Sequence, residues 1–297
     1  MKNNNVRPII FSVITFLLLM VLILCTVVTV SLHLKAPISQ EEPSTESSDM
    51  AQEESGEDEV VSSVTEEKSS EGSEETQDPW LLQQGMDGGQ SYLSSLTFLG
   101  DSTTYGLIEA GVLPDGKDTN QVWFGVTGRT ITFSYVETVK VTNDRSDKEG
   151  MTIVQMAEKE KPEILVITLG VTGGVSSGLS KDAFTALYSK MITDIISVSP
   201  DTKIICNSIY PVCKSIDADL APRIDNEKIS AANKWILQVV KEQYKQGNAV
   251  YYLDSYSAII GADGYLPENY SNGDGLHLSA LAFQEVLSLL RTHKVPN

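Results

Sequence analysis

Short apolar segments alternate with amphipathic segments from about residue 85 to residue 297, and this alternation limits the possible folds more than any other feature. Five apolar runs of four to six residues are typical of strands that are buried on both faces of a sheet. They lie at 96–99, 121–124, 164–169, 203–207 and 249–253. The pattern predicts an α/β domain in which helices cover both faces of a mostly parallel, five-stranded sheet.

The segments between the apolar runs have the periodicity of helices with one apolar face. Three helices are expected to begin at Ser180, at about Asp225 and after Ser279, and a weaker candidate covers 151–159. Residues 132–146 fit neither a helical nor a strand period, although 139–142 has the composition of a short additional strand.

The N-terminal part of the chain contains 24 consecutive residues without a charge, at 9–32. This length is sufficient for a helix to cross a bilayer core of ~30 Å, and no small-residue cleavage site of a signal peptide follows it. We therefore expect a transmembrane signal-anchor helix over 9–34. Lys2 and Arg7 precede the helix, so residues 1–8 are predicted to be cytoplasmic. The chain is then a single-pass protein of the cell membrane whose folded domain is extracellular.

An acidic stretch follows, with 15 Asp and Glu and one Lys between residues 39 and 78. Its net charge of −14 accounts for most of the −18 of the whole chain, so the acidity says little about the folded domain. The stretch is rich in Ser and Glu and lacks aromatic residues, which predicts a disordered linker over 35–84. Its role is either that of a spacer or that of a binding segment for cations or a basic partner.

The cysteines and glycines exclude several classes of cofactor site. Cys206 and Cys213 lie seven residues apart. A disulfide is chemically permitted outside the cell, but Cys206 lies in a strand-like run and a buried free thiol is favoured. The chain has no Cys/His spacing of a metal site and no nucleotide-binding glycine loop. We expect no metal, no organic cofactor and no nucleic-acid partner.

Polar residues occur where the predicted strands end. Ligands bind to open α/β sheets at the carboxyl ends of the strands. The segment Gly100-Asp101-Ser102 follows the first strand, "GVTGRT" at 125–130 follows the second, and "GVTGG" at 170–174 follows the third. A fourth segment, "DGLH" at 274–277, precedes the last helix.

Ser102 at the end of the first strand is either a nucleophile or a cap of the next helix. A serine nucleophile needs a base and a group that orients the base. The chain has three histidines; His33 lies at the end of the predicted span and His293 near the C-terminus, so His277 is the candidate base. Asp274, three residues earlier in a glycine-containing loop, can turn back toward the imidazole.

These four segments resemble the conserved blocks of the SGNH (GDSL) hydrolase family, in the same order and over residues 96–292. The resemblance implies a flavodoxin-like three-layer α/β/α fold and hydrolysis of esters by a triad of Ser102, His277 and Asp274. It also implies an oxyanion hole formed by the backbone of Ser102 and by Gly128. Thr172 stands where the family has an asparagine donor. Either its hydroxyl donates in place of the amide, from a shorter side chain, or the segment is only a glycine-rich turn and the site relies on Ser102 and Gly128.

A membrane anchor and this resemblance together predict an esterase that removes acyl groups from carbohydrate, peptidoglycan or lipid esters outside the cell. Arg129, beside the second block, is a candidate for binding an anionic group of the substrate, although an arginine on a loop is often only solvated. Two alternatives are an acyltransferase that moves an acyl group onto a cell-envelope glycan, and a non-catalytic binding module with the same fold.

Overall fold

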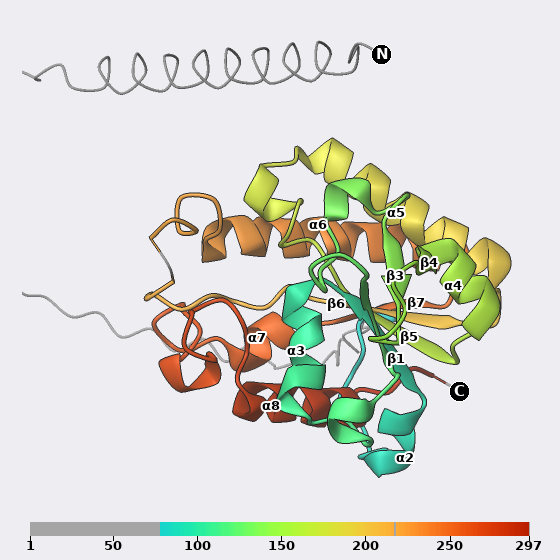
Figure 1. Cartoon of the computed structure of the whole chain (residues 1–297), viewed down its shortest axis with the longest axis horizontal. Helices are drawn as coiled ribbons and strands as arrows, with labels where there is room; N and C mark the ends of the chain where they lie inside the picture. Colours follow the sequence, from blue (N-terminus) through green and yellow to red (C-terminus); the bar gives the residue numbers. More distant parts are fainter. Residues whose placement is uncertain (1–77, 217, 297) are drawn as a thin grey trace, which may run out of the picture. The chain divides into compact units, whose positions relative to one another are not determined.

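A seven-stranded sheet forms the centre of the computed structural model, which describes residues 78–216 and 218–296 (Figure 1). The strand order is β4-β3-β2-β1-β5-β6-β7. The strands are β1 (Leu96–Gly100), β2 (Val122–Gly125), β3 (Lys140–Thr142), β4 (Met151–Thr152), β5 (Ile164–Thr168), β6 (Lys203–Asn207) and β7 (Val250–Leu253).

The five predicted strands are present and parallel, in the order β2-β1-β5-β6-β7. The expected number of strands is nevertheless wrong, because the sheet has seven. The two additional strands, β3 and β4, are antiparallel and extend the sheet beyond β2. β3 coincides with the short additional strand suggested at 139–142. β4 has only two residues and no apolar run of its own. It is a strand because it pairs with β3.

Helices cover both faces of the sheet, as predicted. The helices are α2 (Gly89–Ser94), α3 (Ser102–Ala110), α4 (Ile153–Glu160), α5 (Lys181–Val198), α6 (Asn226–Lys245), α7 (Ser255–Ile259) and α8 (Ala280–Thr292). Figure 1 shows α4, α5 and α6 on one side of the sheet and α3, α7 and α8 on the other. The structure is thus a three-layer α/β/α arrangement.

Alternate residues of the central strands enter two separate cores. On β5, Leu165 and Ile167 pack with the residues of α5 and α6, whereas Ile164 and Val166 pack with those of α3 and α8. All five residues of β5 are buried. Burial on both faces explains why these strands appear in the sequence as continuous apolar runs.

The edge strand β7 pairs with a segment that precedes the expected start of the domain. Leu82 N–H donates to the Tyr252 carbonyl, and Tyr252 N–H donates to the Trp80 carbonyl. The indole of Trp80 contacts the Tyr244 ring and lies under the Lys241 ammonium. The segment falls inside the range 35–84 assigned to the linker, so ordered structure begins before residue 85.

The other expectations for the N-terminal part concern residues outside those described. Within 78–216 and 218–296, no helix has the length and hydrophobicity needed to cross a bilayer. The described range excludes the predicted cytoplasmic segment (1–8), the predicted transmembrane helix (9–34) and nearly all of the predicted linker. Cys206 and Cys213 are both free and buried.

Candidate active site

Ser102 lies at the start of α3, directly after β1. The N-cap of α3 is Asp101, whose carboxylate accepts a hydrogen bond from Thr103 N–H at 3.0 Å. Ser102 is therefore not the capping residue, and its hydroxyl does not serve the helix terminus. The Ser102 hydroxyl instead contacts His277 Nε2, at the carboxyl end of β1.

Asp101 joins α3 to the loop after β5. One carboxylate oxygen accepts from the backbone and the hydroxyl of Thr103, and the other accepts from Thr172 N–H at 3.2 Å. The side chain is 1 % exposed. Burial raises the pKa of the Asp101 carboxyl, against the opposing effect of its hydrogen bonds with Thr103 and Thr172.

The loop before α8 is held in shape by internal hydrogen bonds. Ser271 Oγ accepts from the N–H groups of Gly273 and Gly275, and one Asp274 oxygen accepts from the N–H groups of Leu276 and His277, both at 2.8 Å. Gly275 has a φ of 76°, and a Cβ there would lie 2.7 Å from the Ile216 Cα. Glycine is favoured at this position because the φ is positive and the Ile216 backbone leaves little room for a Cβ.

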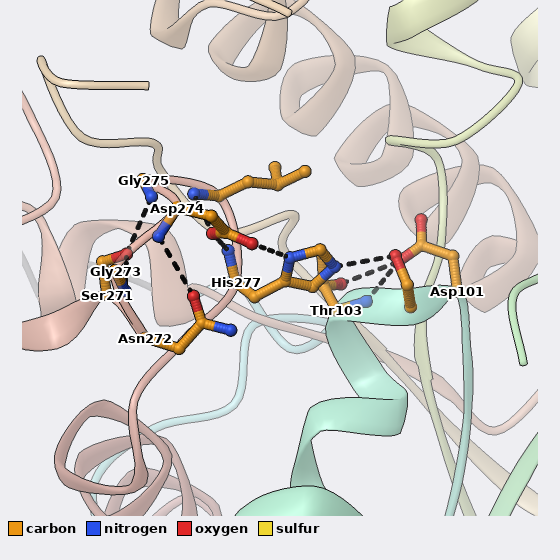
Figure 2. A network of polar contacts seen from close by, with 10 residues as sticks. Asp101, Thr103, Ser271, Asn272, Gly273, Asp274, Gly275 and His277 are labelled. Atoms are coloured by element: carbon orange, nitrogen blue, oxygen red, sulfur yellow. Dashed lines mark hydrogen bonds and ion pairs between the residues drawn. The ribbon is translucent and has the colours of Figure 1, made fainter. Parts of the chain in front are cut away.

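Two hydrogen bonds in series connect Asp274, His277 and Ser102. His277 Nδ1 lies 2.6 Å from Asp274 Oδ2, and His277 Nε2 lies 2.9 Å from Ser102 Oγ. Figure 2 shows the His277 ring between Asp274 and the start of α3, where Asp101 and Thr103 lie. The structure thus brings together three side chains that the sequence singled out, across 175 residues.

The electrostatics favour an ionised Asp274. Burial acts to raise the pKa of its carboxyl, but the hydrogen bonds from the backbone and ring of His277 and from the backbone of Leu276 outweigh it, so the pKa lies below its ordinary value. The side chains of His277 and Asp274 are 27 % and 46 % exposed. The pair is accessible from solvent rather than sealed in the core.

The three expected oxyanion donors differ in what they contact. Gly128, with a φ of 66°, lies in the exposed loop after β2, and its N–H forms no hydrogen bond with any described residue. Ser102 N–H donates to Thr130 Oγ1 at 3.1 Å. Thr172 N–H donates to Asp101, while its hydroxyl has no partner among the described side chains and backbone.

Arg129 adopts a conformation that is unusual for a residue with a side chain. Its φ is 56°, and its guanidinium carbon lies 5.1 Å from the centre of the Tyr105 ring, in the geometry of a cation–π contact. Arg129 lines a cavity of about 280 Å³ beside α3, together with Lys117, Arg145 and one carboxylate, Glu109. None of these three cations forms an ion pair with a carboxylate in the part of the chain that the structure describes.

Two residues near Ser102 have no role that the sequence predicts. Thr130 contacts Ser102, and Asp101 holds the Thr172 loop. Aspartate is a common N-cap residue, but the second contact of Asp101 depends on a loop 71 residues away. Thr130 was visible only as the last letter of "GVTGRT".

The arrangement contains the parts needed for nucleophilic catalysis: a hydroxyl, an imidazole within hydrogen-bond distance, and a carboxylate on the other ring nitrogen. Within residues 78–216 and 218–296, no group of three or more His, Cys, Asp or Glu side chains is arranged to hold a metal ion.

Comparison with known proteins agrees with this class of site. Residues 98–284 match the model of the GDSL-like lipase/acylhydrolase family. The chain belongs to this family and is an ester hydrolase of the SGNH type. No curated protein sequence is significantly similar to it.

Solved structures include similar chains at low identity. A GDSL-like lipase from Bacteroides thetaiotaomicron is 19 % identical, with 65 % of this chain and 84 % of that chain covered and a TM-score of 0.44. An active-site mutant of a family two carbohydrate esterase from Clostridium thermocellum is 17 % identical, with 66 % and 61 % covered and a TM-score of 0.43.

Proposed function

We propose that the protein hydrolyses carboxylic esters with Ser102 as nucleophile, His277 as base and Asp274 as the group that orients the base. Ser102 Oγ attacks the ester carbonyl carbon while its proton passes to His277 Nε2. Asp274 accepts the hydrogen bond from Nδ1–H, so it selects the tautomer with a free Nε2 and stabilises the imidazolium that forms.

The tetrahedral intermediate carries its negative charge on the former carbonyl oxygen. Gly128 N–H is the open donor for this oxygen, with Ser102 and Thr172 as the other members of the proposed oxyanion hole. The intermediate collapses when the alcohol leaves with the proton from Nε2. Water then attacks the acyl-enzyme while His277 Nε2 accepts its proton. The acid is released when the bond to Ser102 Oγ breaks and His277 returns this proton to Ser102 Oγ.

The observation that supports this function most strongly is the pair of bonds at 2.9 and 2.6 Å that runs from Ser102 to Asp274. The test is hydrolysis of p-nitrophenyl acetate by the full-length chain. Ser102→Ala and His277→Ala are each expected to abolish turnover above the residual level. His293→Ala is the matched control, because it removes a histidine at the C-terminal end of α8. This variant is expected to retain the turnover of the parent protein. Near-normal turnover in His277→Ala would exclude the proposed base.

A fluorophosphonate probe gives a second test, because it reacts with activated serines. Mass spectrometry is expected to find the probe on Ser102. Release of acetate without a glycan acceptor supports hydrolysis, whereas turnover only in the presence of an acceptor supports acyl transfer. If the probe does not label Ser102 and no ester is turned over, the result favours the non-catalytic alternative.

The cations beside α3 suggest what kind of ester is bound. Arg129 is adjacent to Thr130, which contacts Ser102, and Tyr105 lies one helical turn after Ser102. We therefore propose that Arg129, with Lys117 and Arg145, binds an anionic group carried by an acylated carbohydrate, peptidoglycan or lipid. Arg145 donates a hydrogen bond to the Lys117 carbonyl, which keeps two of the cations together.

Matched esters test this assignment: 4-acetoxybenzoate, which is anionic, and its neutral methyl ester. Arg129→Asn removes the charge, and asparagine tolerates the positive φ of this position. Its kcat/KM is expected to fall about fivefold for the anionic ester, because an exposed ion pair contributes up to ~1 kcal/mol. The kcat/KM for the neutral ester is expected to be unchanged. Lys234→Gln on α6 is the matched control, and its kcat/KM is expected to be unchanged for both esters. Equal loss on both esters would contradict anion binding.

The location outside the cell is also a proposal, and it rests on the uncharged segment 9–32 and its basic flank. Protease added to intact cells is expected to release the folded domain by cutting within residues 39–78. A domain that is protected in intact cells and cut only after lysis would reverse the proposed orientation.

A further inference from the structure

One threonine hydroxyl contacts the backbone of the proposed nucleophile directly. Ser102 N–H donates to Thr130 Oγ1 at 3.1 Å, across 28 residues. Thr130 ends the "GVTGRT" loop after β2, and both residues are partly buried. The contact therefore joins this loop to the first turn of α3, at the point where the ester would react.

The backbone of the loop fixes the position of Thr130. A Cβ added at Gly125 would lie 1.8 Å from the Thr130 carbonyl oxygen, so the loop returns tightly to the end of β2. The return is made by two consecutive residues with positive φ, Gly128 at 66° and Arg129 at 56°. Thr130 is thus held by a defined turn rather than by an extended loop.

The hydrogen of the Thr130 hydroxyl is available. A threonine hydroxyl can donate one hydrogen bond while its oxygen accepts others. Here the oxygen accepts from Ser102, and no described residue accepts the hydroxyl hydrogen. A hydroxyl that already accepts from an N–H group is a better donor, because hydrogen bonds in a chain polarise one another.

We infer that Thr130 is an oxyanion-hole residue whose hydroxyl donates to the negatively charged oxygen of the tetrahedral intermediate. The inference rests on the proposed function of Ser102. Thr130 is then a side-chain donor in addition to Gly128 and Thr172. Ser102 N–H, which donates to Thr130 Oγ1, acts on the oxyanion through the Thr130 hydroxyl and not by direct contact. The proton stays on Thr130 Oγ1 throughout, because the residue only donates a hydrogen bond.

If Thr130 had a different role, removal of its hydroxyl would have the opposite effect on turnover. If Thr130 merely occupies Ser102 N–H, the oxyanion must displace it, and removal of the hydroxyl would leave turnover unchanged or raise it. If Thr130 is a donor, removal lowers turnover, because removal of one oxyanion donor costs ~10²–10³ in kcat.

The variants are Thr130→Val, which keeps the shape without the hydroxyl, and Thr130→Ser, which keeps the hydroxyl. Thr127→Val in the same loop is the matched control, since Thr127 is exposed and forms no hydrogen bond with the described chain. With p-nitrophenyl acetate, Thr130→Val is expected to lower kcat by ~10²-fold at nearly constant KM. Thr130→Ser and Thr127→Val are expected to remain close to the parent protein. Thr130→Ala replaces the valine variant if that one does not fold.

Phenylboronic acid reports the contact with the oxyanion at equilibrium, and the Thr130→Ser variant separates this contact from a displaced Ser102. It adds to a serine oxygen and forms a tetrahedral anion that imitates the intermediate. Its inhibition constant is expected to rise in Thr130→Val by a factor similar to the loss in kcat. Unchanged or faster turnover in Thr130→Val, unchanged boronate affinity, or a serine variant as slow as the valine variant would each overturn the inference. If Ser102→Ala is inactive while Thr130→Val is fully active, this inference fails and the proposed nucleophile stands.

Discussion

Replacement of Asp274 by asparagine separates the orientation of the base from the folding of its loop. The Asp274 carboxylate makes three contacts: Oδ1 accepts from Leu276 N–H and His277 N–H, and Oδ2 contacts His277 Nδ1. An asparagine keeps the oxygen that binds the two backbone groups. Its amide nitrogen takes the place of Oδ2 and cannot accept the hydrogen of Nδ1. The loop therefore persists, but the imidazole is left with the wrong tautomer.

The expected loss follows from this geometry. With Nδ1 as acceptor, Nε2 carries the hydrogen and cannot take the proton of Ser102. The corresponding substitution in a Ser-His-Asp triad lowers kcat by ~10⁴. Asp274 is 46 % exposed, so water compensates part of the lost charge. We therefore expect a loss of ~10³–10⁴ in kcat, or about 4–5.5 kcal/mol of transition-state stabilisation.

The assay is p-nitrophenyl acetate hydrolysis at pH 7 by the full-length chain, together with thermal unfolding. The unfolding temperature of Asp274→Asn is expected to be close to that of the parent protein. Asp274→Ala loses all three contacts, so its unfolding temperature is expected to be lower. Turnover within about threefold of the parent in a folded Asp274→Asn would show that Asp274 does not orient His277.

Further predictions concern pH, a thiol and a glycine. Because the folded-state pKa of Asp274 is lowered, its contribution to stability is present above its ordinary pKa of ~3.9 and is lost as the pH falls through the lower value. The difference in unfolding temperature between the parent and Asp274→Ala should therefore shrink between pH 7 and pH 3, and a constant difference would contradict the shift. Burial raises the pKa of the Cys206 thiol, so a thiol reagent should modify it only after unfolding; rapid modification of the native protein would argue against its burial. Gly275→Ala should lower the free energy of unfolding by ~1–3 kcal/mol, since the new Cβ contacts Ile216 and the φ is positive. It should also reduce turnover, because His277 lies in the same loop. An unchanged unfolding temperature and activity would disprove the close approach of Gly275 to Ile216.

The part of the fold that the sequence predicts is the part fixed by burial. The strands β1, β5, β6 and β7 are buried on both faces, so their apolar runs identify them without knowledge of their neighbours. β4 is different, because Met151 and Thr152 are only half-buried and become a strand through pairing with β3. Pairing of this kind has no local signal in the chain.

The site shows the same division. The contacts among Ser102, His277 and Asp274 could be predicted because the chain has three histidines, of which His277 alone lies in a loop beside a predicted helix start, and because the segments around all three residues resemble blocks of the SGNH family. The contact of Thr130 with Ser102 N–H was not identifiable, because it depends on how a loop turns back through Gly128 and Arg129. A positive φ at an arginine contradicts its local preference. In the fold, the Arg129 guanidinium contacts the Tyr105 ring and the loop returns closely to the end of β2, and neither contact has a local signal in the sequence.

The pairing of residues 80–82 with β7 has a consequence for how copies of the domain meet one another. An open edge strand exposes N–H and C=O groups to which a strand of a neighbouring molecule can hydrogen-bond, and natural sheets cover or shorten such edges. Here one edge of the sheet ends in the two-residue β4, and the other is covered by the Trp80 and Leu82 backbone. A recombinant fragment that begins at residue 85 would lose this cover and leave the N–H and C=O of Tyr252 unpaired. Such a fragment should self-associate strand to strand, whereas one that begins before residue 78 should stay monodisperse.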